Sequence, residues 1–154
     1  MMNSKNRLIW SGIAIAIAAP LIAAGYLHAQ RDSFSCEAYT TIIQGDAAIE
    51  LIMNYDFRQG KGHYQSSGEY SSPGKPTIRL SNKVEFDYWH EAGRVIMISS
   101  ETNELPRKDF PFRNVIPDFY HLRERGVSFQ VVPANDASYY FLYAGSPVFY
   151  CIRD

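Results

Sequence analysis

Apolar and polar residues alternate along most of the chain after residue 33. Every second residue from Ala47 to Phe57 is apolar, and Glu50, Asn54 and Asp56 lie between them. The segments 34–44 and 84–91 show the same period of two, and 94–100 is a further predicted strand. This period is typical of β-strands with one buried face, so the pattern predicts antiparallel strands with apolar side chains inside.

Clusters of glycine, proline, asparagine and aspartate separate these segments and predict tight turns. The predicted turns are Gly45-Asp46, Ser72–Pro76, Ala92-Gly93, Asn135-Asp136 and Gly145–Pro147. The alternation breaks from Leu105 to Gly126, with prolines at 106, 111 and 117, and residues 117–125 predict a short helix. We therefore expect a mainly β fold with a short helix, either an antiparallel lipocalin-like barrel or a sheet curved over the helix.

The segment Leu8–Leu27 has no charged residue and is mostly apolar. As a helix it would span about 30 Å, the thickness of the hydrocarbon core, and Pro20 would kink it. Lys5 and Arg7 precede it, so the positive-inside rule places the N-terminus in the cytoplasm. We expect a cytoplasmic tail (1–7), a single transmembrane helix (8–27), a linker (28–33) and a periplasmic β-rich domain (34–154).

A cleaved signal peptide is the alternative to a retained helix. Its best cleavage site, Leu27-His28-Ala29, has leucine where a small residue is preferred, which favours retention. Either way, most of the chain is exported. Small residues at Gly12, Ala16, Ala19 and Ala23 form a stripe that would let a second membrane helix approach, although alanine-rich helices also show such stripes by chance.

The net charge of −1 and the lack of a basic patch argue against direct nucleic acid binding. The two cysteines, Cys36 and Cys151, lie near the two ends of the exported part. In an oxidising compartment we expect a disulfide between them, the alternative being two buried thiols. No metal-ligand spacing is present, and we expect neither a metal nor a cofactor.

Catalytic motifs are also missing. The sequence has no GxSxG, no HExxH and no phosphate-binding loop, so we expect a protein that is not an enzyme. The exported histidines are His63, His90 and His121, and mild acid would charge an unperturbed imidazole. His90, at the end of an apolar face, is a candidate for a pH switch, although a purely structural histidine is the simpler interpretation.

Aromatic residues make up 14% of the chain, with eleven tyrosines and nine phenylalanines. Those on the two most aromatic strands are candidates for the wall of a ligand cavity, with ordinary cross-strand packing as the alternative. The candidate ligand-binding residues are Phe86, Tyr88, His90, Tyr139, Phe141 and Tyr143.

Several features together resemble the FidL-like family of small bacterial inner-membrane proteins. They are the N-terminal apolar segment, Phe34-Ser35-Cys36, the strand 84–90, and the ending Gly-Ser-Pro-Val-Phe-Tyr-Cys at 145–151. The resemblance covers nearly the whole chain. PsaF and MyfF, accessory proteins of fimbrial regulators, look like relatives of similar design. These proteins are similar in role to ToxS and VtrC, each of which acts beside a ToxR-like transcription regulator in the membrane.

The resemblance implies a non-enzymatic accessory subunit of the bacterial inner membrane. It would bind, stabilise and tune a membrane-bound winged-helix transcription regulator through its periplasmic domain, and would sense acid or a small apolar ligand such as a bile salt. The shared motifs do not identify which individual residues would contact a ligand. A stand-alone envelope protein that binds an apolar small molecule in its barrel is the alternative, and an envelope hydrolase is a third.

Overall fold

The computed structural model describes residues 4–31, 33–106 and 112–153. Residues 1–3, 32, 107–111 and 154 lie outside the described part, and with them the start of the predicted tail, one residue of the predicted linker, and Pro111. The chain forms two compact units, Met1–Ser33 and Phe34–Asp154. Each unit is considered by itself.

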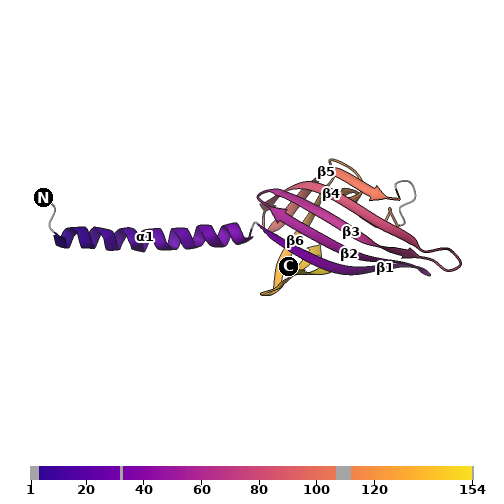
Figure 1. Cartoon of the computed structure of the whole chain (residues 1–154), viewed down its shortest axis with the longest axis horizontal. Coiled ribbons are helices and arrows are strands. Elements are labelled where there is room, and N and C mark those ends of the chain that lie inside the picture. Colours follow the sequence, from indigo (N-terminus) through magenta and orange to yellow (C-terminus); the bar gives the residue numbers. More distant parts are fainter. Residues whose placement is uncertain (1–3, 32, 107–111, 154) are drawn as a thin grey trace. The chain divides into compact units, whose positions relative to one another are not determined.

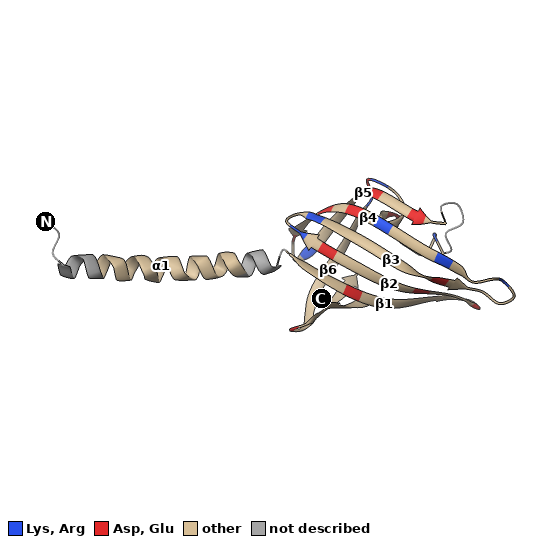
Figure 2. Ribbon diagram, in the orientation of Figure 1, with Lys and Arg blue, Asp and Glu red and all other residues tan. Residues whose placement is uncertain are grey.

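The first unit contains one helix, α1 (Ser4–Arg31), with Pro20 inside it. Its segment Ile9–Tyr26 has 18 residues with a mean hydropathy of 1.8, long and apolar enough to cross a membrane or to serve as a signal sequence. Figure 2 shows no basic or acidic residue along this stretch. Gly12, Ala16, Ala19 and Ala23 lie on this helix and are exposed.

The second unit is a closed barrel of antiparallel strands (Figure 1). Each strand pairs with the next in the sequence, and β8 pairs with β1. This confirms the expected mainly β fold and selects the barrel over the open sheet. The strands are β1 (Phe34–Gln44), β2 (Ala47–Arg58), β3 (Lys61–Ser71), β4 (Ile78–Glu91), β5 (Arg94–Leu105), β6 (Gly126–Asn135), β7 (Ser138–Tyr143) and β8 (Ser146–Arg153).

The alternation along the sequence determines which side chains enter the barrel. On β2, Ile49, Leu51 and Met53 are buried, whereas Glu50 and Asn54 are exposed. Charged residues are spread over the strands of the barrel (Figure 2), and those of β2 such as Glu50 and Arg58 are exposed. Burial of the inward apolar faces drives closure, at roughly 25 cal/mol for each Å² removed from water.

Two-residue turns fix the register of several hairpins. At Ala92-Gly93, between β4 and β5, φ is 49° and 75°. A type I′ turn needs positive φ at both central positions, and its twist matches that of the flanking strands. The turn after β7 is Ala144-Gly145, so Ser146 and Pro147, predicted as turn residues, begin β8 instead.

The predicted helix over residues 117–125 is wrong in extent. Only Asp118–Tyr120 is helical, as a single 3-10 turn, η1. The following residues bond to β5: the amide of Ser99 donates to the carbonyl of Arg125 (3.0 Å), and the amide of Glu124 donates to the carbonyl of Ser99 (2.7 Å). These hydrogen bonds to β5 replace the bonds that would continue the helix. Residues 124 and 125 thus pair with β5 at Ser99, directly after the β5–β6 register ends at Ile98↔Gly126.

Pairing between β1 and β8 closes the barrel over three residue pairs, which run from Cys36↔Arg153 to Ala38↔Cys151. The predicted disulfide is confirmed at this seam: Cys36 and Cys151 are bonded and fully buried. The covalent bond therefore joins the first and last strands where the hydrogen-bonded ladder is short.

One part of the interior is filled by aromatic rings. Phe57 stacks on Phe34 with ring centroids 4.6 Å apart and meets Phe86 edge-on at 5.5 Å. Phe141 lies 4.6 Å from Phe149. An eight-stranded barrel is just wide enough to be filled by side chains or to hold one small ligand. In this protein the rings fill one region and leave a cavity in another.

Candidate functional site

An apolar cavity of about 320 Å³ opens into the barrel and is partly exposed to solvent, at the small end of the range for ligand pockets. Side chains from β1 to β4 and from β6 to β8 line it, together with the segment that contains η1. The lining residues are Thr40, Ile42, Leu51, Met53, Tyr64, Ser66, Asn82, Val115, Ile116, Pro117, Tyr120, His121, Phe129, Tyr143, Val148 and Phe149.

A small residue on β3 helps to make this space. Ser66 follows Tyr64 on the inward parity of the strand and lines the cavity, where a larger side chain would fill it. Gly68, two residues further on, has a different role. A Cβ at Gly68 would lie 1.9 Å from the carbonyl oxygen of Glu50 and 2.8 Å from Leu51 Cδ2, so this position admits no side chain without movement of the backbone. Gly68 thus lets β3 approach Glu50 and Leu51 of β2 closely.

The cavity borders the seam between β1 and β8. Thr40 and Ile42 of β1 come two and four residues after Ala38, the last residue of β1 paired with β8, and Val148 and Phe149 precede Cys151 on the other side. The β1–β8 register among the described residues ends at Ala38↔Cys151. The walls of the cavity here are therefore two strand segments that no backbone ladder joins to each other.

The 3-10 turn contributes Tyr120 to the wall of the cavity. Its hydroxyl lies 2.7 Å from the hydroxyl of Tyr55, a buried hydrogen bond between η1 and β2. Burial raises the pKa of Tyr120 and of Tyr55, and raises that of the neighbouring Tyr64 to about 12. All three phenols therefore stay neutral, and the ring of Tyr64 lies tilted against those of Tyr55 and Tyr120, with centroids 4.9 and 4.8 Å away.

Asn82 on β4 supplies an amide to the cavity and is 2% exposed. Its Nδ2 donates to the backbone carbonyl of Tyr120 at 2.8 Å, which fixes the orientation of the carboxamide. Its Oδ1 is buried and accepts no hydrogen bond from any residue in the described part of the chain. An unsatisfied buried polar atom costs about 1–3 kcal/mol, so it indicates an unfilled acceptor position.

A buried polar cluster holds the lining segment to β5. His121 Nδ1 lies 2.5 Å from Glu104 Oε2, and Arg113 forms an ion pair with the other oxygen of the same carboxylate. Burial lowers the pKa of His121 to about 4; the charge of Arg113 acts in the same direction and that of Asp118 opposes it. At neutral pH the uncharged imidazole therefore donates from Nδ1 to Glu104.

Three of the candidate ligand residues lie in the aromatic core. Phe86, Tyr88 and Phe141 are 2%, 6% and 0% exposed. Phe57 contacts all three, with ring centroids 5.1 to 6.5 Å away. These rings are packed against other rings and do not line the cavity.

The other three candidates are dispersed. Tyr143 lines the cavity and is partly exposed. Tyr139 packs on Phe34 with centroids 4.8 Å apart. His90 is exposed near the end of β4, where its ring meets that of Tyr88 edge-on at 6.0 Å. The structure thus brings one of the six predicted residues to the cavity.

The sequence contained a signal for two residues that these predictions missed. Asn82 and Ser66 are polar residues at inward positions of otherwise apolar strand faces, and they are direct neighbours in the β3–β4 register. A polar residue on a buried face needs a partner, so this departure from the pattern marks the site. No local signal pointed to Tyr120 or His121, because folding of the distant segment 112–125 brings them to the barrel.

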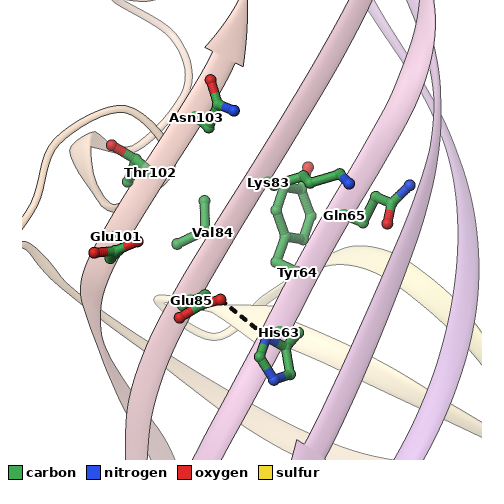
Figure 3. Close-up of a pocket in the computed structure, with 9 residues that line it drawn as sticks. All are labelled: His63, Tyr64, Gln65, Lys83, Val84, Glu85, Glu101, Thr102 and Asn103. Carbon is green, nitrogen blue, oxygen red and sulfur yellow. Dashed lines mark ion pairs between the residues drawn. The ribbon is translucent and has the colours of Figure 1, made fainter.

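A second hollow, on the outer face of β3, β4 and β5, is shown in Figure 3. His63 Nδ1 lies 3.9 Å from Glu85 Oε1 there, and both side chains are at least 60% exposed. Tyr64 and Val84 border the hollow but are buried in the barrel. Its outward side chains are solvated and converge on no common point, so the internal cavity is the stronger candidate.

The described residues contain no group of three or more His, Cys, Asp or Glu side chains placed to hold a metal ion. The fold and the cavity define the class: an eight-stranded up-and-down barrel with an internal apolar site, the architecture of lipocalins. The chain belongs to the YqeJ C-terminal domain family, whose model matches residues 33–151. No curated protein matches the sequence.

Proposed function

We propose that this protein is a non-enzymatic accessory subunit of the bacterial inner membrane. Its periplasmic barrel binds a small apolar molecule and, through the same domain, binds and tunes a membrane-bound winged-helix transcription regulator. The observation that carries the proposal is the closed barrel with an apolar cavity. The regulator as partner rests on the resemblance to the FidL-like family.

Ligand binding is supported by the composition of the cavity. Its volume of about 320 Å³ suits a molecule of one to three rings, and its walls are mainly aliphatic and aromatic. A few polar groups interrupt these walls, among them Asn82, Ser66 and His121. Apolar walls with a few fixed polar groups are what a small-molecule site requires, because the walls give affinity and the polar groups give orientation.

Docking of a partner is supported by an exposed apolar patch on the outer face of β7, β8, β1 and β2, which we call the outer patch. Tyr140 and Tyr150 are cross-strand neighbours with rings 5.2 Å apart, and Ile152 follows on the same face of β8. Tyr39 of β1 and Ile52 of β2 continue the patch. Contiguous exposed apolar side chains are typical of interaction surfaces.

Helix α1 supports the proposed location. A retained helix over Ile9–Tyr26 would hold the chain in the membrane, with Lys5 and Arg7 in the cytoplasm and the barrel in the periplasm. The disulfide agrees with this location, because disulfides persist in the oxidising periplasm.

Two neighbouring residues of β1 test the ligand site. Thr40 points into the cavity and Thr41 is exposed outside. Native mass spectrometry of the full-length chain extracted from bacterial membranes should detect a bound apolar molecule in the wild type and in Thr41→Phe. Thr40→Phe fills the cavity, and the adduct should disappear. An adduct that persists equally in both variants contradicts binding in the barrel.

Co-expression tests the partner. A winged-helix regulator with one membrane span should co-purify with the wild-type chain and have a longer lifetime in its presence. Ile152→Lys places a charge in the outer patch and should reduce co-purification at least tenfold. Ile98→Lys makes the same change at an exposed position on β5, outside the patch, and should have no effect. A regulator that purifies separately and is equally stable alone contradicts the accessory role.

A stand-alone envelope protein that binds an apolar molecule is the second candidate function. The closed barrel favours it, because the β1–β8 pairing completes the sheet without a strand from another chain. The two candidates share the ligand test and differ only in the co-expression result.

A further inference from the structure

The orientation of Asn82 points to a more specific ligand. We infer that the cavity selects an apolar molecule that carries a neutral hydrogen-bond donor, such as a hydroxyl group, and that Asn82 Oδ1 accepts this bond. The inference rests on the proposed function and names the chemical class of the ligand. Asn82 is then the specificity-determining residue of the site.

The carboxamide of Asn82 has one orientation that satisfies its surroundings. Nδ2 donates to the carbonyl of Tyr120 at 2.8 Å, and an exchange of the oxygen and nitrogen positions would set two oxygens against each other. Oδ1 therefore faces away from Tyr120. It is buried, and within the described part of the chain no donor reaches it. Only a donor can satisfy it, so a ligand with acceptor groups alone would leave it unpaired.

The neighbouring charges favour a neutral donor. Glu104 is the cross-strand neighbour of Asn82 on β5. Its carboxylate is paired with Arg113 and hydrogen-bonded to His121. A ligand cation would compete with Arg113 for this carboxylate, and a ligand anion would be desolvated beside it. A hydroxyl group loses less hydration than either ion and gains the bond to Oδ1.

The remaining lining gives the ligand its apolar body. Leu51, Met53, Ile116 and Phe149 offer no hydrogen bond from their side chains. One donor at one end of a rigid apolar frame would therefore meet Asn82 while the frame contacts these side chains. A fused-ring alcohol has this form.

Matched naphthalene probes test the inference. Binding is measured by isothermal titration calorimetry of the full-length chain in lipid nanodiscs, with the heat of empty nanodiscs subtracted. We expect 2-naphthol to bind about tenfold more tightly than 2-methoxynaphthalene, because the methoxy group keeps the oxygen atom but cannot donate a hydrogen bond. 2-Naphthoate should also bind at least tenfold more weakly than 2-naphthol. This comparison needs no variant.

Asn82→Leu removes the acceptor and should bring the affinity ratio of 2-naphthol to 2-methoxynaphthalene close to one. Asn103→Leu makes the same substitution on the exposed face of β5 and should keep the tenfold ratio. A wild-type ratio near one, with both probes bound, overturns this inference and leaves cavity binding intact. Failure of both probes to bind contradicts the inference and the proposed function together.

Discussion

The disulfide between Cys36 and Cys151 should contribute a large part of the stability of the barrel. It joins residues 115 positions apart, and both cysteines are fully buried. In the chain-entropy model, a closed loop of this length stabilises the fold by about 4.8 kcal/mol at 25 °C. Replacing both cysteines with alanine should lower the free energy of unfolding by about 4–5 kcal/mol, a large fraction of the total for a domain of this size.

Urea unfolding of the full-length chain in detergent, followed by the circular dichroism of the sheet, measures this loss. Wild-type protein treated with a reductant in urea should match the double variant, whereas reductant should not change the double variant. The location of the bond adds a second readout. Amide hydrogen exchange should rise more at Glu37 and Ala38, on the short β1–β8 ladder, than on β3.

A loss below about 1 kcal/mol would refute this reasoning. It would mean that the three-pair ladder and the aromatic core close the barrel without the covalent bond. Equal increases in exchange around the whole barrel would contradict the localised role of the bond at the seam.

Acid should destabilise the barrel through His121. Folding lowers the pKa of this imidazole from 6.5 to about 4, so between these values the unfolded chain binds a proton that the folded chain does not. The free energy of unfolding should therefore fall by about 2 kcal/mol between pH 7 and pH 5. In urea unfolding, His121→Gln should remove this loss, and an equal loss in both proteins would exclude the histidine as its source. Gly68→Ala should cost more than about 2 kcal/mol because its Cβ would overlap the carbonyl oxygen of Glu50. Gly126→Ala, with 3.8 Å to its nearest neighbour, should cost less than about 1 kcal/mol, and equal losses would contradict the steric account. The full-length chain should resist carbonate extraction from membranes, whereas a soluble product that begins near residue 30 would show a cleaved signal peptide.

Much of the barrel was predictable because strand periodicity is a local property. Ile49, Leu51 and Met53 are buried as their alternation predicts, and the turn at Ala92-Gly93 lies where its residues predict it. The extent of the helix after Pro117 was not predictable from local signals. The backbone of Glu124 and Arg125 forms hydrogen bonds with Ser99 of β5, which lies far away in the sequence.

The cavity was harder to predict than the strands. Periodicity shows which residues face inward, but not which inward layers are filled. Phe86 and Phe141 pack against other rings, whereas the small side chain of Ser66 leaves space. Whether a ring fills or borders a void depends on its partners on other strands, and no single strand specifies them.

Two methionines allow the most direct test of the central claim, that the barrel interior takes up an apolar guest. Met53 lines the cavity, whereas Met97 is fully buried outside its lining. With ¹³C-methyl-labelled methionine in the full-length chain, addition of 2-naphthol should shift the Met53 methyl resonance and produce cross-relaxation with the naphthol ring, and should leave Met97 unchanged. An unchanged Met53 resonance at saturating 2-naphthol, or equal shifts of both methyl groups, would contradict the claim.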